Sequence, residues 1–221
     1  MKRPTFSVIL PTFNRARVLA AAIESVQAQS ERDWELIIID DGSTDITRRL
    51  VARYAQSDPR IRYIAQRNRG VAKARNNGIR AALGRYLAFV DSDDTLRPNH
   101  LSYRLETFLK FPELEFIYSG AIIKGSRFVP DRFDPTRVVS LDDKDVYLCG
   151  TFTVKTATAI KLGGFPDVRY SEDGDFMRNA QAAGVKMLRV AKKTYTYNRS
   201  SEDSICGEIL KSTKSDYVAR S

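Results

Sequence analysis

Residues 34–41 read WELIIIDD, a run of apolar side chains that ends in two adjacent aspartates. A run this rich in Leu and Ile predicts a strand that is covered on both faces, as the strands of parallel sheets are. The residues that follow, 42–54, predict a helix with Ile46 among its apolar residues and with Ser43 or Thr44 as its amino-terminal cap. A buried strand followed at once by a helix is the repeating unit of α/β folds.

The same alternation continues on both sides of this unit. Four apolar runs predict strands: residues 6–10, 34–40, 61–66 and 85–90. Three stretches with helical periodicity lie between them: residues 17–29, 41–54 and 70–83, the last ended by Gly84. This order predicts right-handed crossovers and a parallel sheet, so the expected fold class is α/β. Ligands of such sheets bind outside the carboxyl ends of the strands, and that edge is where we expect the site.

The second half of the chain is less regular. Pro98 suits the first turn of a helix that runs to Phe111, and residues 124–144 predict a long loop. A long ordered loop in a compact domain is often a binding surface. The other expected elements are a strand, a short helix ended by two glycines, a longer helix and a last pair of strands: residues 114–123, 156–164, 170–185, 186–191 and 194–198.

Length and composition limit the possible classes of protein. The 221 residues suit one α/β domain, and 36 Lys and Arg against 27 Asp and Glu give a net charge of +9. Such a surface attracts phosphates, nucleic acid or acidic lipid headgroups, and the net charge does not indicate which of these anions binds. Cys149 and Cys206 are too few for a disulfide framework and lack metal-site spacing, which fits a reducing cytoplasm. No segment predicts a signal peptide or a membrane span, so any membrane contact is expected to be peripheral.

Three aspartates gather where the fourth predicted strand ends. The sequence FVDSDDTL (89–96) contains Asp91, Asp93 and Asp94. Their mutual repulsion is unfavourable unless a cation or water offsets it. Mg²⁺ and Mn²⁺ take one or two protein carboxylates and complete their shells with water and substrate phosphates. The cluster therefore predicts a metal–diphosphate site, although an Asp-rich turn also arises by chance in a chain with 27 acidic residues.

Two further acidic pairs have both a functional and a purely structural interpretation. Asp40 at a strand end can accept a hydrogen bond from a base N–H, such as N3 of uracil or thymine, while Asp41 serves as a helix cap. A turn with a cap would also explain both residues without any ligand. Glu172 and Asp173 begin a predicted helix, whose amino terminus should keep a carboxylate ionised near pH 7, as a general base requires; dipole compensation explains them equally well. His100, the only histidine, is interpreted as a helix surface residue.

Six segments together resemble the inverting family 2 glycosyltransferases, which have the GT-A fold. These are SVILPTFNR, ELIIIDDGSTD, NRGVAKARNNGI, GRYLAFVDSDD, LGGFPD and SEDGDFMR, in the family's order, over roughly residues 5–180. Each is weak alone, but six in sequence are specific. The resemblance implies a mostly parallel central sheet flanked by helices, with a smaller mixed region on the acceptor side. It also implies one domain, in which residues 1–98 bind the nucleotide-sugar and residues 99–221 bind the acceptor.

The resemblance also assigns roles to particular residues. On the donor side, Asp40 would bind the base, with help from the segment that holds Pro11, Thr12 and Asn14 and from Arg75. Asp91 would lie near the ribose or the sugar. Asp93 would coordinate Mg²⁺ or Mn²⁺ bridging the diphosphate, and Asp94 is a second candidate ligand. Asp173 would deprotonate the acceptor hydroxyl, and Arg199 would cover the diphosphate.

The expected function is a metal-dependent, inverting hexosyl transfer from a nucleotide-sugar, UDP- or dTDP-linked, to a hydroxyl. The acceptor would be a glycan or a lipid-linked molecule in cell-surface polysaccharide or glycolipid synthesis. We expect a cytoplasmic protein without a nucleic-acid partner, whose basic surface suits peripheral contact with an anionic inner membrane face. The rival interpretations are a sugar nucleotidyltransferase, which would need a glycine-rich phosphate loop that LPTFNR lacks, and a phospho-acceptor regulatory domain.

Overall fold

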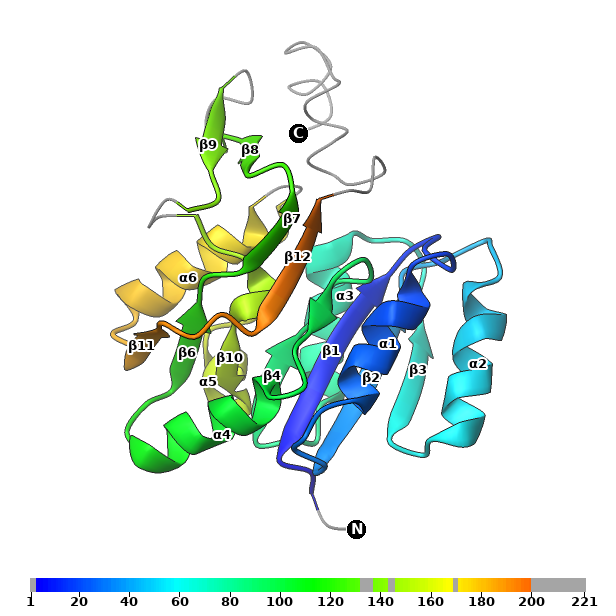
Figure 1. Ribbon diagram of the computed structural model, residues 1–221, viewed down its shortest axis with the longest axis horizontal. Coiled ribbons are helices and arrows are strands. Elements are labelled where there is room, and N and C mark those ends of the chain that lie inside the picture. Colours follow the sequence, from blue (N-terminus) through cyan, green and yellow to red (C-terminus); the bar gives the residue numbers. More distant parts are fainter. Residues whose placement is uncertain (1–2, 132–136, 143–145, 169–170, 200–221) are drawn as a thin grey trace.

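The computed structural model describes residues 3–131, 137–142, 146–168 and 171–199. Its first half is the predicted alternation of strands and helices (Figure 1). The strands are β1 (Phe6–Thr12), β2 (Trp34–Asp40), β3 (Ile61–Ala65) and β4 (Tyr86–Phe89). The helices between them are α1 (Leu19–Gln27), α2 (Thr47–Ser57) and α3 (Val71–Ala81). β1 pairs in parallel with both β2 and β4, and β2 pairs in parallel with β3, which confirms the prediction.

The central sheet continues into the second half of the chain. It has seven strands in the order β11-β6-β10-β4-β1-β2-β3. The added strands are β6 (Phe116–Ser119), β10 (Thr153–Lys155) and β11 (Met187–Val190). Because β10 runs antiparallel to both of its neighbours, β6 and β11 point the same way as β4. The sheet is therefore mostly parallel, as expected.

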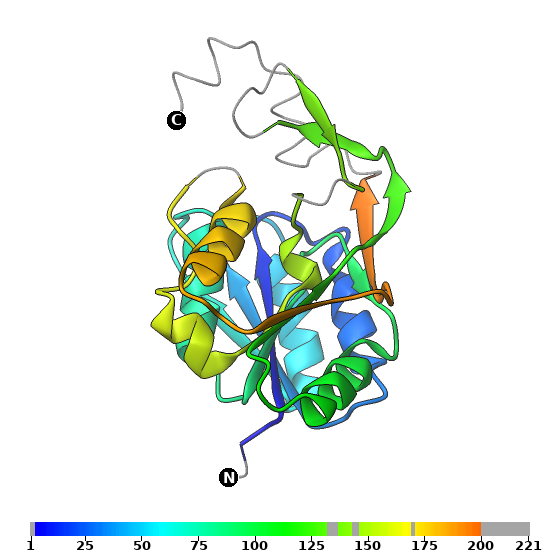
Figure 2. The ribbon, with the colours of Figure 1, turned by 90° about the vertical axis from the view of Figure 1, so that its left-hand side faces the viewer.

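Helices cover both faces of this sheet, as the edge-on view in Figure 2 shows. One hydrophobic cluster joins alternate strand residues to α1, α2 and α4 (His100–Lys110). A second cluster joins the intervening residues to α3, α5 (Thr156–Lys161) and α6 (Glu172–Ala182). Val8 belongs to the first cluster and its neighbour Ile9 to the second, because successive side chains of a strand point to opposite faces.

Two small sheets lie outside the central one. β5 (Thr95–Leu96), β12 (Tyr195–Arg199) and β7 (Ile122–Gly125) form a mixed sheet beside the carboxyl end of β4. β8 (Phe128–Pro130) and β9 (Val138–Ser140) form an antiparallel pair. A smaller mixed region beside the central sheet is therefore present, as the resemblance implies.

Three predictions for the second half were wrong. The strand at 114–123 breaks at Gly120 and Ala121 into β6 and β7, which belong to different sheets. The loop at 124–144 contains the end of β7 and the β8–β9 pair; residues 132–136 and 143–144 lie outside the described part of the chain. The last two strands do not pair with each other, because β11 joins β6 whereas β12 joins β5 and β7.

Local contacts correct two further predictions. Neither Ser43 nor Thr44 caps α2, because the Ser43 hydroxyl accepts a hydrogen bond from the Asn14 N–H instead, and Ile46 is 67% exposed. His100 is fully buried rather than on the surface, and its Nδ1 lies 2.9 Å from the Thr194 hydroxyl. The partner of His100 lies 94 residues away in the chain, so its burial has no local sequence signal.

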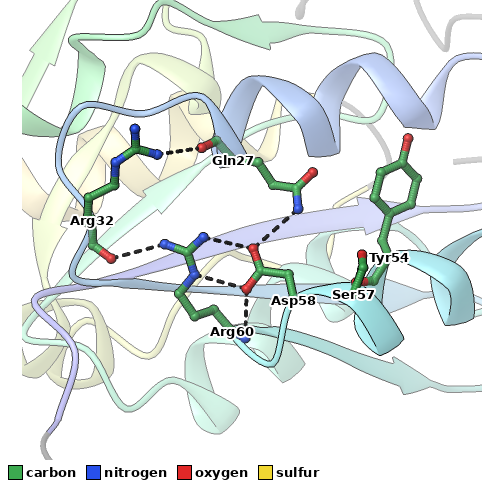
Figure 3. A network of polar contacts seen from close by, with 6 residues as sticks. All are labelled: Gln27, Arg32, Tyr54, Ser57, Asp58 and Arg60. Atoms are coloured by element: carbon green, nitrogen blue, oxygen red, sulfur yellow. Dashed lines mark hydrogen bonds and ion pairs between the residues drawn. The ribbon is translucent and has the colours of Figure 1, made fainter.

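A network of polar contacts lies at the end of the sheet where β3 begins (Figure 3). Arg60 donates two hydrogen bonds from its side chain to the carboxylate of Asp58, at 2.9 and 2.8 Å, and a third to the carbonyl of Arg32. Gln27 of α1 donates to the same carboxylate at 3.2 Å. The guanidinium of Arg60 also lies 3.6 Å from the ring centre of Trp34. This edge is opposite the one that carries the acidic clusters, so we assign the network a structural role.

Candidate functional site

The strand register brings the acidic clusters to one edge of the sheet. Thr12 at the end of β1 pairs with Asp40 at the end of β2, and the Asp41 N–H donates to the Thr12 carbonyl at 2.8 Å. On the other side of β1, Ile9 pairs with Phe89, so the turn that contains Asp91 follows directly beyond. The carboxyl ends of β1, β2 and β4 therefore meet, which confirms that the acidic clusters lie at the same edge of the sheet.

Asp40 is buried and held in place at the strand end. Its exposed fraction is 2%, and its two oxygens accept hydrogen bonds from the Ser43 N–H at 2.8 Å and from the Tyr63 hydroxyl at 2.5 Å. Burial and the Asp40 carboxylate raise the pKa of Tyr63, so this hydroxyl stays a donor. Because a carboxylate can accept about four hydrogen bonds, Asp40 retains capacity for a further donor.

Asp41 does not cap α2 and instead binds the residues that precede α3. Its carboxylate accepts hydrogen bonds from the backbone N–H groups of Arg69 and Gly70, at 2.9 and 2.8 Å, and from the Gln66 side chain at 2.7 Å. These contacts order the segment that leads into α3 rather than the start of α2. The cap assignment was therefore wrong, since the bonded N–H groups of Arg69 and Gly70 precede Val71, the first residue of α3, and no side chain caps α2 or α3.

The residues after β1 are held by hydrogen bonds to the residues after β2. Asn14 adopts a positive φ of 53°, and its side-chain oxygen accepts a hydrogen bond from the Thr44 N–H at 2.8 Å. Pro11 and Thr12 are buried at the end of β1. Phe13, the residue beyond Thr12, is 44% exposed at this edge. Phe13 is not among the site residues predicted from the sequence. An aromatic residue in the turn directly after a buried strand is a signal that could have identified it.

The turn at 91–94 places its three aspartates in different surroundings. The Asp94 N–H donates to the Asp91 carbonyl at 3.1 Å and closes the turn. Asp91 has a side chain that is 31% exposed, and Asp93 is also partly exposed. Burial and the nearby charge of Asp91 raise the pKa of Asp93, while the positive charges of Arg15 and Arg199 oppose this. Asp94, by contrast, is fully buried.

Arg75 connects this turn to the second acidic cluster. Its side chain is only 4% exposed, and it lies between Asp91, at 2.6 Å, and Glu172, to which it also donates a hydrogen bond. The guanidinium lies 5.5 Å from the ring centre of Phe165. A buried cation between two carboxylates fixes both acidic motifs relative to each other. Arg75 is therefore paired with two protein carboxylates inside the candidate site. Its expected role in binding the base of the donor stays a prediction.

Asp173 lies in the first turn of α6, as expected, and its surroundings raise its pKa. Its carboxylate accepts hydrogen bonds from the N–H groups of Gly174, at 2.8 Å, and Cys149, at 3.3 Å. Burial and the charge of Glu172 raise the pKa of Asp173 to about 7, and the charge of Arg75 only partly opposes this. A pKa of about 7 leaves about half of the Asp173 carboxylates ionised at pH 7, fewer than the helix terminus alone led us to expect, because burial opposes the dipole.

The carboxylates do not form a metal cage by themselves. Across the described residues, no group of three or more His, Cys, Asp or Glu side chains is arranged to hold a metal ion. Asp93 is partly exposed at the acidic turn and suits a site in which substrate oxygens and water complete the shell.

Among the described residues, no helix has the length and apolar character needed to span a membrane.

Comparison with known proteins agrees with this fold. The family model described as "Glycosyl transferase family 2" matches residues 7–148. The chain belongs to this family. The structure resembles S. aureus TarS residues 1–349 in complex with UDP, with a TM-score of 0.73 at 24% identity, covering 90% of this chain and 62% of that one. It also resembles the mannosyltransferase PcManGT from Pyrobaculum calidifontis, in complex with GDP-Man and Mn²⁺, with a TM-score of 0.70 at 22% identity over 89% of this chain and 57% of that one. The fold is GT-A, as predicted.

Three curated relatives match between 52% and 66% of the chain. The succinoglycan biosynthesis protein ExoO of Rhizobium meliloti is 40% identical over 146 residues, which is 66% of this chain and 37% of that protein. The putative teichuronic acid biosynthesis glycosyltransferase TuaG of Bacillus subtilis is 38% identical over 133 residues, 59% of this chain and 52% of that protein. Chondroitin synthase of Escherichia coli is 35% identical over 116 residues, 52% of this chain and 17% of that protein. The chain thus spans between 17% and 52% of the lengths of these three relatives.

Proposed function

We propose that this protein transfers a hexose from a nucleoside diphosphate sugar to a hydroxyl acceptor, with inversion, during the synthesis of a cell-surface polysaccharide. The observation that carries the proposal is the buried link from Asp91 through Arg75 to Glu172 and Asp173, at the sheet edge that also carries Asp40. It links the acidic turn, which would lie on the donor side, to a carboxylate whose pKa is about 7. The names of ExoO, TuaG and chondroitin synthase support a polysaccharide product.

The donor base would lie between Asp40 and Phe13. Asp40 is a buried acceptor with two protein donors already in place, so it favours a base that offers an N–H, as uracil and thymine do at N3. The exposed ring of Phe13 offers a face on which a base can stack. We therefore favour a UDP- or dTDP-sugar. In this assignment, residues 1–98 bind the donor, with the segment of Pro11, Thr12 and Asn14 shaping the base pocket.

The diphosphate would lie over the turn at 91–94. Asp91 would contact the ribose or the sugar, and Asp93 would hold Mg²⁺ or Mn²⁺. When bound, the cation supplies positive charge beside the departing diphosphate. The charges of Arg15 and Arg199 already act on Asp93, so both side chains are placed to attract the diphosphate as well. The bound Mn²⁺ of the mannosyltransferase PcManGT supports this assignment.

Asp173 would act as the general base. It would accept the proton of the acceptor hydroxyl as that oxygen attacks the anomeric carbon from the face opposite the diphosphate, through an oxocarbenium-like transition state. A base with a pKa near the working pH combines a useful deprotonated fraction with a useful proton affinity. Residues 99–221 would bind the acceptor. The net charge of +9 suits peripheral contact with an anionic membrane that presents a lipid-linked acceptor.

Calorimetric titration with UDP, in the presence and absence of Mn²⁺, tests the proposal. We expect binding that is at least ~10-fold tighter with Mn²⁺ and that is lost in Asp93→Asn, because a neutral amide is a poor ligand for a hard cation. Asp142→Asn is the matched control, since Asp142 is an exposed carboxylate paired with Arg127. If UDP, dTDP and GDP all fail to bind with Mn²⁺, or if Asp93→Asn binds as the wild type does, the donor-site assignment is wrong.

A further inference from the structure

Asp94 is the most enclosed carboxylate of the acidic turn, and both of its oxygens are used by the protein. It is fully buried. One oxygen accepts a hydrogen bond from the Tyr195 hydroxyl, and the other accepts one from the Asn198 N–H at 2.6 Å. Both donors belong to β12, more than 100 residues further along the chain. The turn that follows β4 is thereby attached to β12 at two points.

Tyr195 is in turn fixed by the short helix at Cys149–Thr151. The tyrosine is 1% exposed, and a Cβ atom added at Gly150 would overlap the end of its ring that carries the hydroxyl. Only glycine allows the backbone to lie this close to the ring. The preceding residue, Cys149, donates its N–H to the Asp173 carboxylate at 3.3 Å. One short segment therefore contacts Tyr195 on one side and the expected general base on the other.

The same strand carries the cation expected at the diphosphate. Arg199 follows Asn198 directly, so the hydrogen bond from Asn198 to Asp94 fixes the backbone next to Arg199. Asp93, the expected metal ligand, adjoins Asp94 on the opposite side of that bond. A shift of β12 against the turn would change the separation of the two groups expected to contact the diphosphate.

We infer that Asp94 and Tyr195 are positioning residues that hold Asp93 and Arg199 in register around the diphosphate, and that Asp94 is not a metal ligand. This inference rests on the proposed function. The sequence made Asp94 a second candidate ligand. Its buried carboxylate, however, is directed to β12, where it receives one neutral donor on each oxygen. The groups it aligns contact the leaving group, so their alignment matters most as charge develops in the transition state.

Steady-state kinetics with Mn²⁺ titration, on the full chain, separates these roles. Asp94→Asn keeps one oxygen that can accept from Tyr195 but loses the acceptor for the Asn198 N–H. It should leave the Mn²⁺ concentration for half-maximal activity, and the calorimetric affinity for UDP with Mn²⁺, within about twofold of the wild type. Asp93→Asn should raise the first and weaken the second about tenfold or more. Tyr195→Phe removes the hydroxyl and should lower kcat about tenfold, with the donor KM changed less than about threefold. The matched control is Tyr54→Phe, which removes a tyrosine–carboxylate hydrogen bond to Glu24 on α1 and should change neither parameter.

The outcomes separate the inference from the function on which it rests. If Asp94→Asn raises the Mn²⁺ requirement as Asp93→Asn does, Asp94 is a ligand and the inference is overturned. It is also overturned if folded Tyr195→Phe retains more than half of the wild-type kcat. If Tyr195→Phe does not fold, the Asp94→Asn titration still decides the point. A wild-type protein that neither binds nor turns over a metal nucleotide-sugar would instead refute the proposed function and, with it, this inference.

Discussion

Replacing Glu172 by glutamine should move the acid limb of the pH–rate profile to lower pH. The charge of Glu172 is the largest cause, after burial, of the raised pKa of Asp173. Glutamine removes that charge while keeping an oxygen that can accept the hydrogen bond from Arg75. With the negative neighbour gone and the charge of Arg75 less compensated, the Asp173 carboxylate should lose its proton more readily.

The size of the effect follows from the pKa of about 7 for Asp173 in the wild type. A base acts only when deprotonated, so the rate should rise with pH, with a unit slope below this pKa and a plateau above it. At pH 6 about a tenth of the molecules would carry an ionised Asp173, and the rate should be about a tenth of the plateau. In Glu172→Gln the midpoint should lie below 7, so activity at pH 6, relative to the plateau, should increase.

The assay is the pH dependence of kcat/KM for the donor, measured between pH 5 and 9 with Mn²⁺ at saturation. This parameter reports ionisations of the free enzyme, to which the pKa of about 7 refers. The dependence of kcat reports the complex, in which a nearby cation should lower the midpoint. Asp175→Asn is the matched control, because Asp175 also lies in the first turn of α6 and pairs with Arg178.

Two results would refute this reasoning. A wild-type midpoint near the ordinary aspartate value of about 4 would show that burial and Glu172 do not set the ionisation of the base. A midpoint that is unchanged in Glu172→Gln, in a variant that melts like the wild type, would show that the group titrating near pH 7 is not Asp173.

Two predictions concern stability. Arg75→Met should lower the free energy of unfolding by about 3–5 kcal/mol, because it leaves Asp91 and Glu172 facing each other without their buried cation. Denaturant unfolding at pH 7 measures this loss, and a loss below about 1 kcal/mol would contradict the prediction. The hydrogen bonds from Arg60 lower the pKa of Asp58 from 3.8 to about 2, so this carboxylate stabilises the fold above about pH 4 and loses that contribution as the pH falls towards 2. Asp58→Asn should therefore cost about 2 kcal/mol at pH 7, and urea unfolding should show the difference from the wild type shrinking between pH 4 and 2; a difference that is constant with pH would exclude this cause.

The sequence by itself determined the parallel half of the fold and the edge at which the acidic clusters gather. Strand β2 coincides with the apolar run at 34–40, because a strand buried on both faces needs apolar side chains at every position. The carboxylates at 40, 91 and 173 were identified because each directly follows or begins a recognisable element. Such signals lie within a few residues of each other, since strand and helix periodicities are local.

Only the tertiary structure decided how these pieces act on one another. The contacts of Arg75 with Glu172 and of Asp94 with Tyr195 join residues 97 and 101 positions apart, a separation at which no periodicity operates. The same holds for β10, which enters the sheet antiparallel between β4 and β6. The pKa of Asp173 likewise depends on burial under distant segments, which outweighs the helix terminus seen in the sequence. Sequence patterns locate the charged groups, but desolvation and pairing, which depend on the packed chain, determine their ionisation and their partners.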